Sequence, residues 1–135
     1  MPPFRWDPSY SVQVKHFDEQ HQQLFRIIND LYDGMRVGSG QEVLRDVLIA
    51  LQDYILLHFA GEEAVMRNTG YPKLQGHIAQ HRKFTSKVED VCTRYIEGRI
   101  GLSIDVLDFL TAWLQQHIVN TDKQYGEFLN SRGIA

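Results

Sequence analysis

The sequence lacks the features that mark secreted, membrane-spanning and disulfide-rich proteins. It has 135 residues and a single cysteine, which excludes an intrachain disulfide framework of the kind that stabilises small extracellular domains. No run approaches about 18 uninterrupted apolar residues, so we expect no membrane span. The N-terminus also lacks the basic and then apolar pattern of a secretory signal peptide. We therefore expect a cytoplasmic protein.

The sequence also lacks an excess of basic residues. Fourteen Lys and Arg stand against 17 Asp and Glu, which gives a formal net charge of −3. Nucleic-acid binding usually needs a basic surface, so we expect no nucleic-acid partner. The hydrophobic fraction of 43% and the charged fraction of 23% are ordinary for a globular protein, and residues 1–135 fit one domain.

The spacing of apolar residues predicts four helices. Residues 1–16 contain Pro2, Pro3 and Pro8, which block a helix, and we expect an ordered N-terminal arm there. From residue 17 onward, apolar side chains recur every three or four positions, as on one face of a helix. The expected helices run from about 17 to 37, from 39 to before 70, from just after 72 to before 98, and from 103 to about 130. Ser39 and Glu42 have the spacing of a capping box, and Ser103 is the expected cap of the fourth helix.

Short connections between long helices favour antiparallel neighbours. The sequence therefore predicts an all-α fold, an antiparallel up-down-up-down four-helix bundle over residues 17–130.

Polar residues interrupt the apolar face of every expected helix. Five of the six histidines and one glutamate fall at positions that should point into the core, where a polar group needs a partner. Early positions of odd helices lie beside late positions of even helices in such a bundle, so these side chains should converge at one level. They are His21, His58, Glu62, His77, His81 and His117.

Such a cluster indicates a metal site. Neutral imidazole is a common ligand of transition metals, and carboxylates can bridge two ions. A single tetrahedral zinc needs only four ligands, so this larger set favours two adjacent metals. Asp122 is the candidate second bridging acid, although its offset of five residues from His117 turns it by about 140° around an α-helix. A π-bulge near Asn120, or an angled side chain, would bring the two together.

Three other residues have plainer interpretations. We expect His16 to be a surface or capping residue, because it precedes the first helix and points to another face. Glu63 should be solvated, because its offset from His58 takes it off the core face. Cys92 has no second thiol beside it and should be a partly buried small residue.

The histidine pattern closely resembles that of the hemerythrins, in particular the single-domain bacterial hemerythrins of the HHE cation-binding family. Four segments carry the resemblance, in the family's order and from residue 17 to about 129. They are FDEQHQQLF, HFAGEEAVM with YP following, HIAQHRKF and WLQQHIVNTDKQY. The combined pattern of H, H-x3-E, H-x3-H and H-x4-D on four helices is highly specific.

The resemblance implies a non-haem di-iron centre that binds O2 reversibly, with two iron ions per chain. By matching position, His77, His81 and His117 would hold one iron. His21 and His58 would hold the other, which keeps an open position for O2. Glu62 and Asp122 would bridge the two irons, with an oxo or hydroxo group as the third bridge. An apolar wall within a helical turn of these ligands would line the O2 pocket and keep out water, formed by Leu24, Phe25, Phe59, Trp113, Leu114 and Ile118.

We therefore expect an oxygen-binding protein for O2 storage, transport or delivery rather than an enzyme. The expected state is a monomer, and an O2-consuming enzyme is the candidate recipient. Two alternatives remain open: O2 or redox sensing, and peroxide or nitric oxide chemistry or iron handling at the same site. Sensors of the family usually carry an attached signalling or membrane domain, and the 135 residues contain none, which favours O2 binding.

Overall fold

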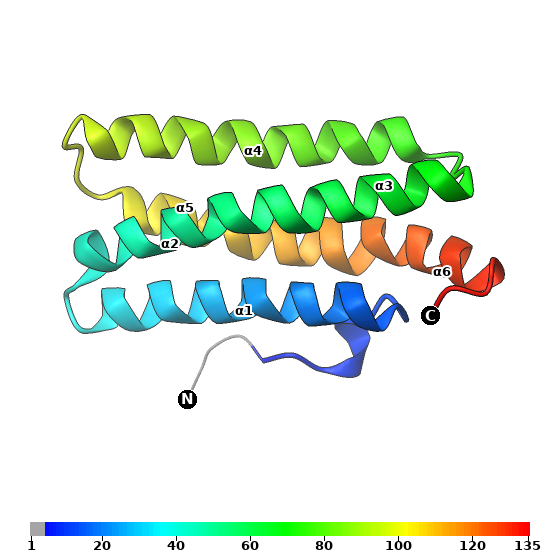
Figure 1. Cartoon of the computed structure of the whole chain (residues 1–135). Helices are drawn as coiled ribbons and strands as arrows, with labels where there is room; N and C mark the ends of the chain where they lie inside the picture. Colours follow the sequence, from blue (N-terminus) through cyan, green and yellow to red (C-terminus); the bar gives the residue numbers. More distant parts are fainter. Residues whose placement is uncertain (1–4) are drawn as a thin grey trace.

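The fold is a bundle of four antiparallel helical rods, in a computed structural model that describes residues 5–135 apart from the side chain of Val119 (Figure 1). The expectations for Pro2 and Pro3 lie outside the described residues. The first rod is α1 (Lys15–Arg36) and the third is α4 (Leu74–Ile96). The second rod comprises α2 (Gly40–Tyr54), η2 (Ile55–Phe59) and α3 (Ala60–Thr69). The fourth comprises α5 (Leu102–Trp113), η3 (Leu114–Asp122) and α6 (Lys123–Ser131).

The expected fold class is confirmed. Residues 5–135 contain no strand, and the only other helical element among them is the short 3-10 turn η1 (Pro8–Tyr10). The described part of the chain also has no helix that is long and apolar enough to cross a membrane.

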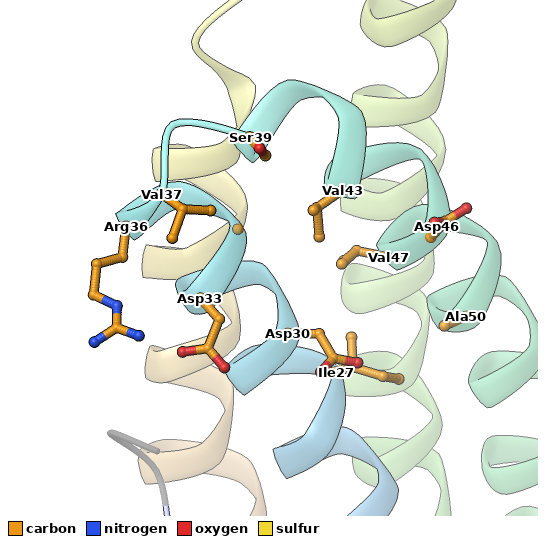
Figure 2. Close-up of a pocket in the computed structure, with 11 residues that line it drawn as sticks. Ile27, Asp30, Asp33, Arg36, Val37, Ser39, Val43, Asp46, Val47 and Ala50 are labelled. Atoms are coloured by element: carbon orange, nitrogen blue, oxygen red, sulfur yellow. The ribbon is translucent and has the colours of Figure 1, made fainter. Parts of the chain in front are cut away.

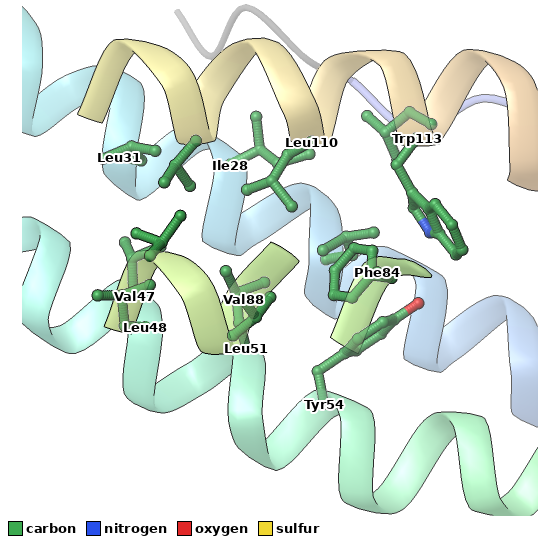
Figure 3. Close-up of a cluster of buried hydrophobic side chains, with 14 of the residues drawn as sticks. Ile28, Leu31, Val47, Leu48, Leu51, Tyr54, Phe84, Val88, Leu110 and Trp113 are labelled. Atoms are coloured by element: carbon green, nitrogen blue, oxygen red, sulfur yellow. The ribbon is translucent and has the colours of Figure 1, made fainter. Parts of the chain in front are cut away.

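The core runs along the axis of the bundle. Each rod turns an apolar face inward, and the larger cluster of buried side chains takes residues from all four rods (Figure 3). Ile28, Leu31 and Leu110 are fully buried there, and burial of such a side chain stabilises the fold by about 1.5–3 kcal/mol. Five side chains of the expected apolar faces are only partly buried: Met35, Ile55, Leu74, Tyr95 and Leu107.

The predicted serine caps are wrong. Ser39 precedes α2, but its side chain makes no capping hydrogen bond; its φ of −107° and ψ of 22° are not the extended values usual for a cap. Ser103 lies inside α5, whose preceding residue is Gly101 with a φ of 78°. Glycine adopts that left-handed conformation without strain, so the backbone turns there and the helix begins earlier than expected.

Two π-helical segments lie in the second and fourth rods. Successive turns of a π-helix align residues five apart rather than four. Within η3 this brings His117 and Asp122 to the same buried face, with 2.9 Å between Nε2 and Oδ1. The π-bulge expected near Asn120 is therefore confirmed, as part of a longer segment. The sequence analysis missed the second π segment, η2, which contains His58.

The N-terminal arm packs on the bundle as expected. Trp6 and Tyr10 contact the ring of Phe25 edge-on, at centroid distances of 5.5 and 4.7 Å. Val12 and Val14 are buried in a second, smaller cluster at the opposite end of the bundle. The arm therefore covers apolar surface that α1 and α6 would otherwise expose.

A surface groove lies between α1 and α2 beside the turn that joins them (Figure 2). Its floor is apolar, with Ile27, Val43 and Val47, and three aspartates stand around it. No histidine is among the residues that line this groove.

We predict that Gly126→Ala destabilises the protein by about 1–3 kcal/mol, because a buried overlap must be relieved by moving backbone. Gly126 lies in α6 directly under the arm, and a Cβ there would overlap the carbonyl oxygen of Val12. The matched control is Gly76→Ala in α4, where a Cβ meets nothing within 4 Å. That control should be neutral or slightly stabilising. Chemical denaturation measures the free energy of unfolding of both variants. Equal values would show that the N-terminal arm moves away from residue 126 without cost.

Candidate metal centre

Seven polar side chains from all four rods converge inside the bundle, each no more than 2% exposed. Their nitrogen and oxygen atoms form two groups, and within each group they lie within 4.8 Å of one another. The smaller group is His21, His58 and Glu62, and the larger is Glu62, His77, His81, His117 and Asp122. All the ligand positions that the sequence predicts are thus brought together, and Glu62 is common to both groups.

Both carboxylates reach histidines of the two groups. Oε1 of Glu62 lies 3.2 Å from Nε2 of His58 and 3.1 Å from Nε2 of His81. Asp122 uses its two oxygens separately. Oδ1 lies 2.9 Å from Nε2 of His117, and Oδ2 lies 3.2 Å from Nε2 of His21. Oε2 of Glu62 also lies 3.6 Å from Nε2 of His21, so each carboxylate places separate oxygens beside the two groups, as a carboxylate that bridges two cations would.

The atoms that face one another are polar groups without hydrogen-bond partners in the protein. They include Nε2 of His21, His77, His81 and His117, Oε1 of Glu62 and both oxygens of Asp122. Each buried polar atom left in that condition costs about 1–3 kcal/mol. A metal ion would satisfy them together, and imidazole nitrogen with carboxylate oxygen suits iron as well as zinc, copper and nickel. The donor set therefore fits a pair of transition-metal ions.

The two carboxyl groups of the cluster have lowered pKa values, which favours the ionised form that a metal would bind. Burial by itself would raise the pKa of Glu62 and of Asp122, but the surrounding imidazoles hold the pKa of both carboxyls below the ordinary range. Both are therefore ionised at neutral pH and act only as acceptors.

Four of the five imidazoles form two pairs with opposite shifts of pKa. Burial opposes the charge on His21 and His77, yet contacts with the two carboxylates outweigh it and raise the pKa of each to about 9. At His58 and His117 burial dominates, and the pKa is lowered. Metal binding would displace the protons from the first pair, because only neutral imidazole coordinates.

Three side chains orient the histidines, and the sequence analysis did not assign them. Nδ1 of His58 lies 2.5 Å from Oε1 of Gln20, and Nδ1 of His117 lies 2.5 Å from Oε1 of Gln80. Nδ1 of His81 lies 2.8 Å from Oε2 of Glu63. An oxygen at Nδ1 accepts its proton and leaves Nε2 free to coordinate. The expectation that Glu63 is solvated is therefore wrong: its side chain is 24% exposed and faces α4.

A sequence signal for the two glutamines exists. Each immediately precedes a histidine of the cluster, as Gln20–His21 and Gln80–His81, but bonds a histidine of another rod. The sequence analysis assigned Tyr125 no role in the site, yet its hydroxyl donates to Oε2 of Glu62. His16 is exposed, as predicted.

The sequence matches the Hemerythrin HHE cation binding domain over residues 12–129. The chain belongs to the hemerythrin family. It is 32% identical to the bacteriohemerythrin of Methylococcus capsulatus over 122 residues, which cover 90% of this chain and 92% of that protein. The bacteriohemerythrin of Clostridium acetobutylicum is 29% identical over 126 residues, covering 90% of this chain and 98% of that protein. The solved structure of a hemerythrin variant with a leucine-to-tyrosine substitution superimposes with a TM-score of 0.85 at 30% identity, over 94% of this chain and 97% of that one.

Aromatic rings pack directly on the histidines of this hemerythrin-family site. Phe59 stacks on His81 with ring centroids 3.9 Å apart and planes 2° from parallel. Trp113 stacks on His117 at 3.9 Å and 14°. Leu24, Leu114 and Ile118 are buried in the same apolar cluster. Phe25 belongs to that cluster too, and its ring contacts the N-terminal arm.

We predict that Gln80→Ala weakens metal binding by about 10–100-fold, because His117 loses the acceptor that fixes its tautomer and ring orientation. The matched control is Gln75→Ala, an exposed glutamine on the same helix. Competition with a chelator, followed by metal analysis, gives the relative affinities. If both variants retained metal equally, His117 would be held by packing on Trp113 alone.

Proposed function

We propose that the chain binds O2 reversibly at a di-iron centre held by the seven buried side chains. The observation that carries the proposal is the pair of ligand groups joined through Glu62, with Asp122 reaching both, in a chain of the hemerythrin family. His77, His81 and His117 hold one iron, and His21 and His58 hold the other. The smaller histidine set leaves that second iron a position for O2.

The bound irons supply the electrons that reduce O2 on binding and recover them on its release. The residues of the chain orient the imidazoles and exclude water. Gln20, Gln80 and Glu63 aim the imidazoles, and Tyr125 holds its proton against Glu62. The apolar residues around the cluster keep water and protons away from the bound gas. We assign the wall of the O2 pocket to Leu24, Phe25, Phe59, Trp113, Leu114 and Ile118.

An O2 store or carrier is favoured over a catalyst by this environment. All seven ligands come from one chain, so the site is complete in a monomer. The orienting oxygens of Gln20, Gln80 and Glu63 are engaged with histidines and are not free to position a substrate. We propose an O2-consuming enzyme as the recipient.

We predict about two irons per chain, because the ligand atoms form two groups. We also predict a visible absorption band that appears when the reduced protein meets air and fades under vacuum. Metal analysis and absorption spectroscopy measure both. His77→Ala should lose iron and the band, because it removes a ligand from the larger group. His16→Ala, at an exposed position, should change neither. A single metal per chain in the wild type would overturn the dinuclear proposal.

We predict that Leu114→Ala keeps both irons and still binds O2, yet oxidises to the ferric form faster, because a cavity next to the centre admits water. Leu114 is 1% exposed and begins η3, one helical turn before His117. The matched control is Leu31→Ala, which truncates a fully buried leucine near the far end of α1. Both should lose roughly 2–5 kcal/mol of stability. Only Leu114→Ala should shorten the lifetime of the oxygenated band in air; equal lifetimes would place the barrier to water elsewhere.

A further inference from the structure

Two buried polar atoms outside the seven ligands have no partner among the described residues. They are the hydroxyl of Tyr54 and the indole nitrogen of Trp113. The other side-chain atoms in that condition belong to the seven predicted ligands; a bound cation would satisfy their Nε2 and carboxylate oxygen atoms, but not Nδ1 of His21 and His77, which face away from it. The Tyr54 hydroxyl and the Trp113 indole nitrogen are hydrogen-bond donors, and both lie beside the proposed iron site.

Tyr54 packs against a ligand of the smaller group. It is the last residue of α2, and its ring stacks on that of His58 with centroids 4.7 Å apart and planes at 24°. The same ring contacts Phe59 at 5.7 Å, which continues the wall assigned to the O2 pocket. Figure 3 shows Tyr54 reaching from α2 into the interior, with its hydroxyl directed toward Trp113 on the opposite rod.

A phenylalanine would serve packing alone better than a tyrosine at this position. Tyr54 is 4% exposed, and a buried hydroxyl without an acceptor destabilises the fold. The carboxylate of Glu62 accepts from Tyr125 at Oε2, and its Oε1 faces the histidines of the metal site. Among the described residues the hydroxyl of Tyr54 is therefore a donor without an acceptor, and it is available to a molecule from outside the protein.

We propose that the hydroxyl of Tyr54 donates a hydrogen bond to the small ligand that binds on the His21 and His58 side of the centre. The inference rests on the proposed function. The ligand class is a small molecule or anion with an exposed oxygen or nitrogen lone pair, such as reduced O2 or azide. Because a negative acceptor strengthens the hydrogen bond, Tyr54 favours ligands that gain charge on binding. It is a polar contact in a pocket whose other assigned residues are apolar apart from the indole nitrogen of Trp113.

The test compares azide binding to the ferric wild-type protein and to Tyr54→Phe. We expect the azide dissociation constant to rise about tenfold, the magnitude of one hydrogen bond to a charged group. Iron content should stay unchanged, because Tyr54 is not a ligand. The melting temperature of the metal-free protein should stay equal or rise, because the variant removes a buried donor that has no protein partner.

The matched control is Tyr95→Phe. The Tyr95 hydroxyl donates to the carbonyl oxygen of Gln41 at 3.3 Å, near the end of the bundle remote from the histidines. This variant should lower the melting temperature of the metal-free protein and leave azide affinity unchanged. The pair of variants therefore separates a hydroxyl that serves the fold from one that serves the ligand.

Two results would overturn the inference: wild-type azide affinity in fully iron-loaded Tyr54→Phe, or a loss of metal-free stability like that of Tyr95→Phe. Unchanged azide affinity would show that the Tyr54 hydroxyl does not contact the ligand. A loss of metal-free stability would show that the hydroxyl stabilises the fold instead. A wild-type protein that takes up iron but binds neither O2 nor azide would instead overturn the proposed function itself.

Discussion

Two ionised carboxylates in the dry interior of the bundle are the constraint on which the rest of the structure depends. A buried charge is tolerated only when it is paired and hydrogen-bonded. Glu62 and Asp122 are paired with the imidazoles that surround them, and Glu62 also accepts a hydrogen bond from Tyr125, but both oxygens of Asp122 need a metal ion to be satisfied. The five histidines in turn need the carboxylates, or a metal, to compensate their own burial. Metal binding and folding are therefore coupled in this chain.

The surroundings of the cluster hold it in one geometry. Gln20, Gln80 and Glu63 fix the tautomers of three histidines from neighbouring helices. Rings stacked on His58, His81 and His117 limit how far these imidazoles can rotate. The apolar residues beside the site belong to the cluster that packs the helices together; in the proposed function the same residues would keep water from the centre. The π-helical segment η3 aligns residues five apart, so that His117 and Asp122 share one face, which an α-helix would not allow.

Several features of the site could be read from the sequence because they repeat with the helix. His58 and Glu62, like His77 and His81, lie four residues apart and share a face in any α-helix. The partners that cross between helices could not be read in this way. Glu63 seemed solvated by its position on its own helix, yet α4 brings His81 to it. The prediction that Ser39 and Ser103 cap their helices was wrong. The chain turns at Gly38 and Gly101, which have positive φ, and these turns set the backbone conformation before each helix.

The sequence by itself determined the four helices, the common level of the histidines and, through its family pattern, the metal chemistry. These follow from periodicity and short connections, which are local properties of the chain. Only the tertiary structure decided which atoms meet. Asp122 reaches His21 with one oxygen and His117 with the other, and the hydroxyl of Tyr54 has no acceptor among the residues that the structure describes. Such contacts depend on the rotation and the axial offset of packed helices. Both are set by side-chain packing between rods, which no pattern within a single helix records.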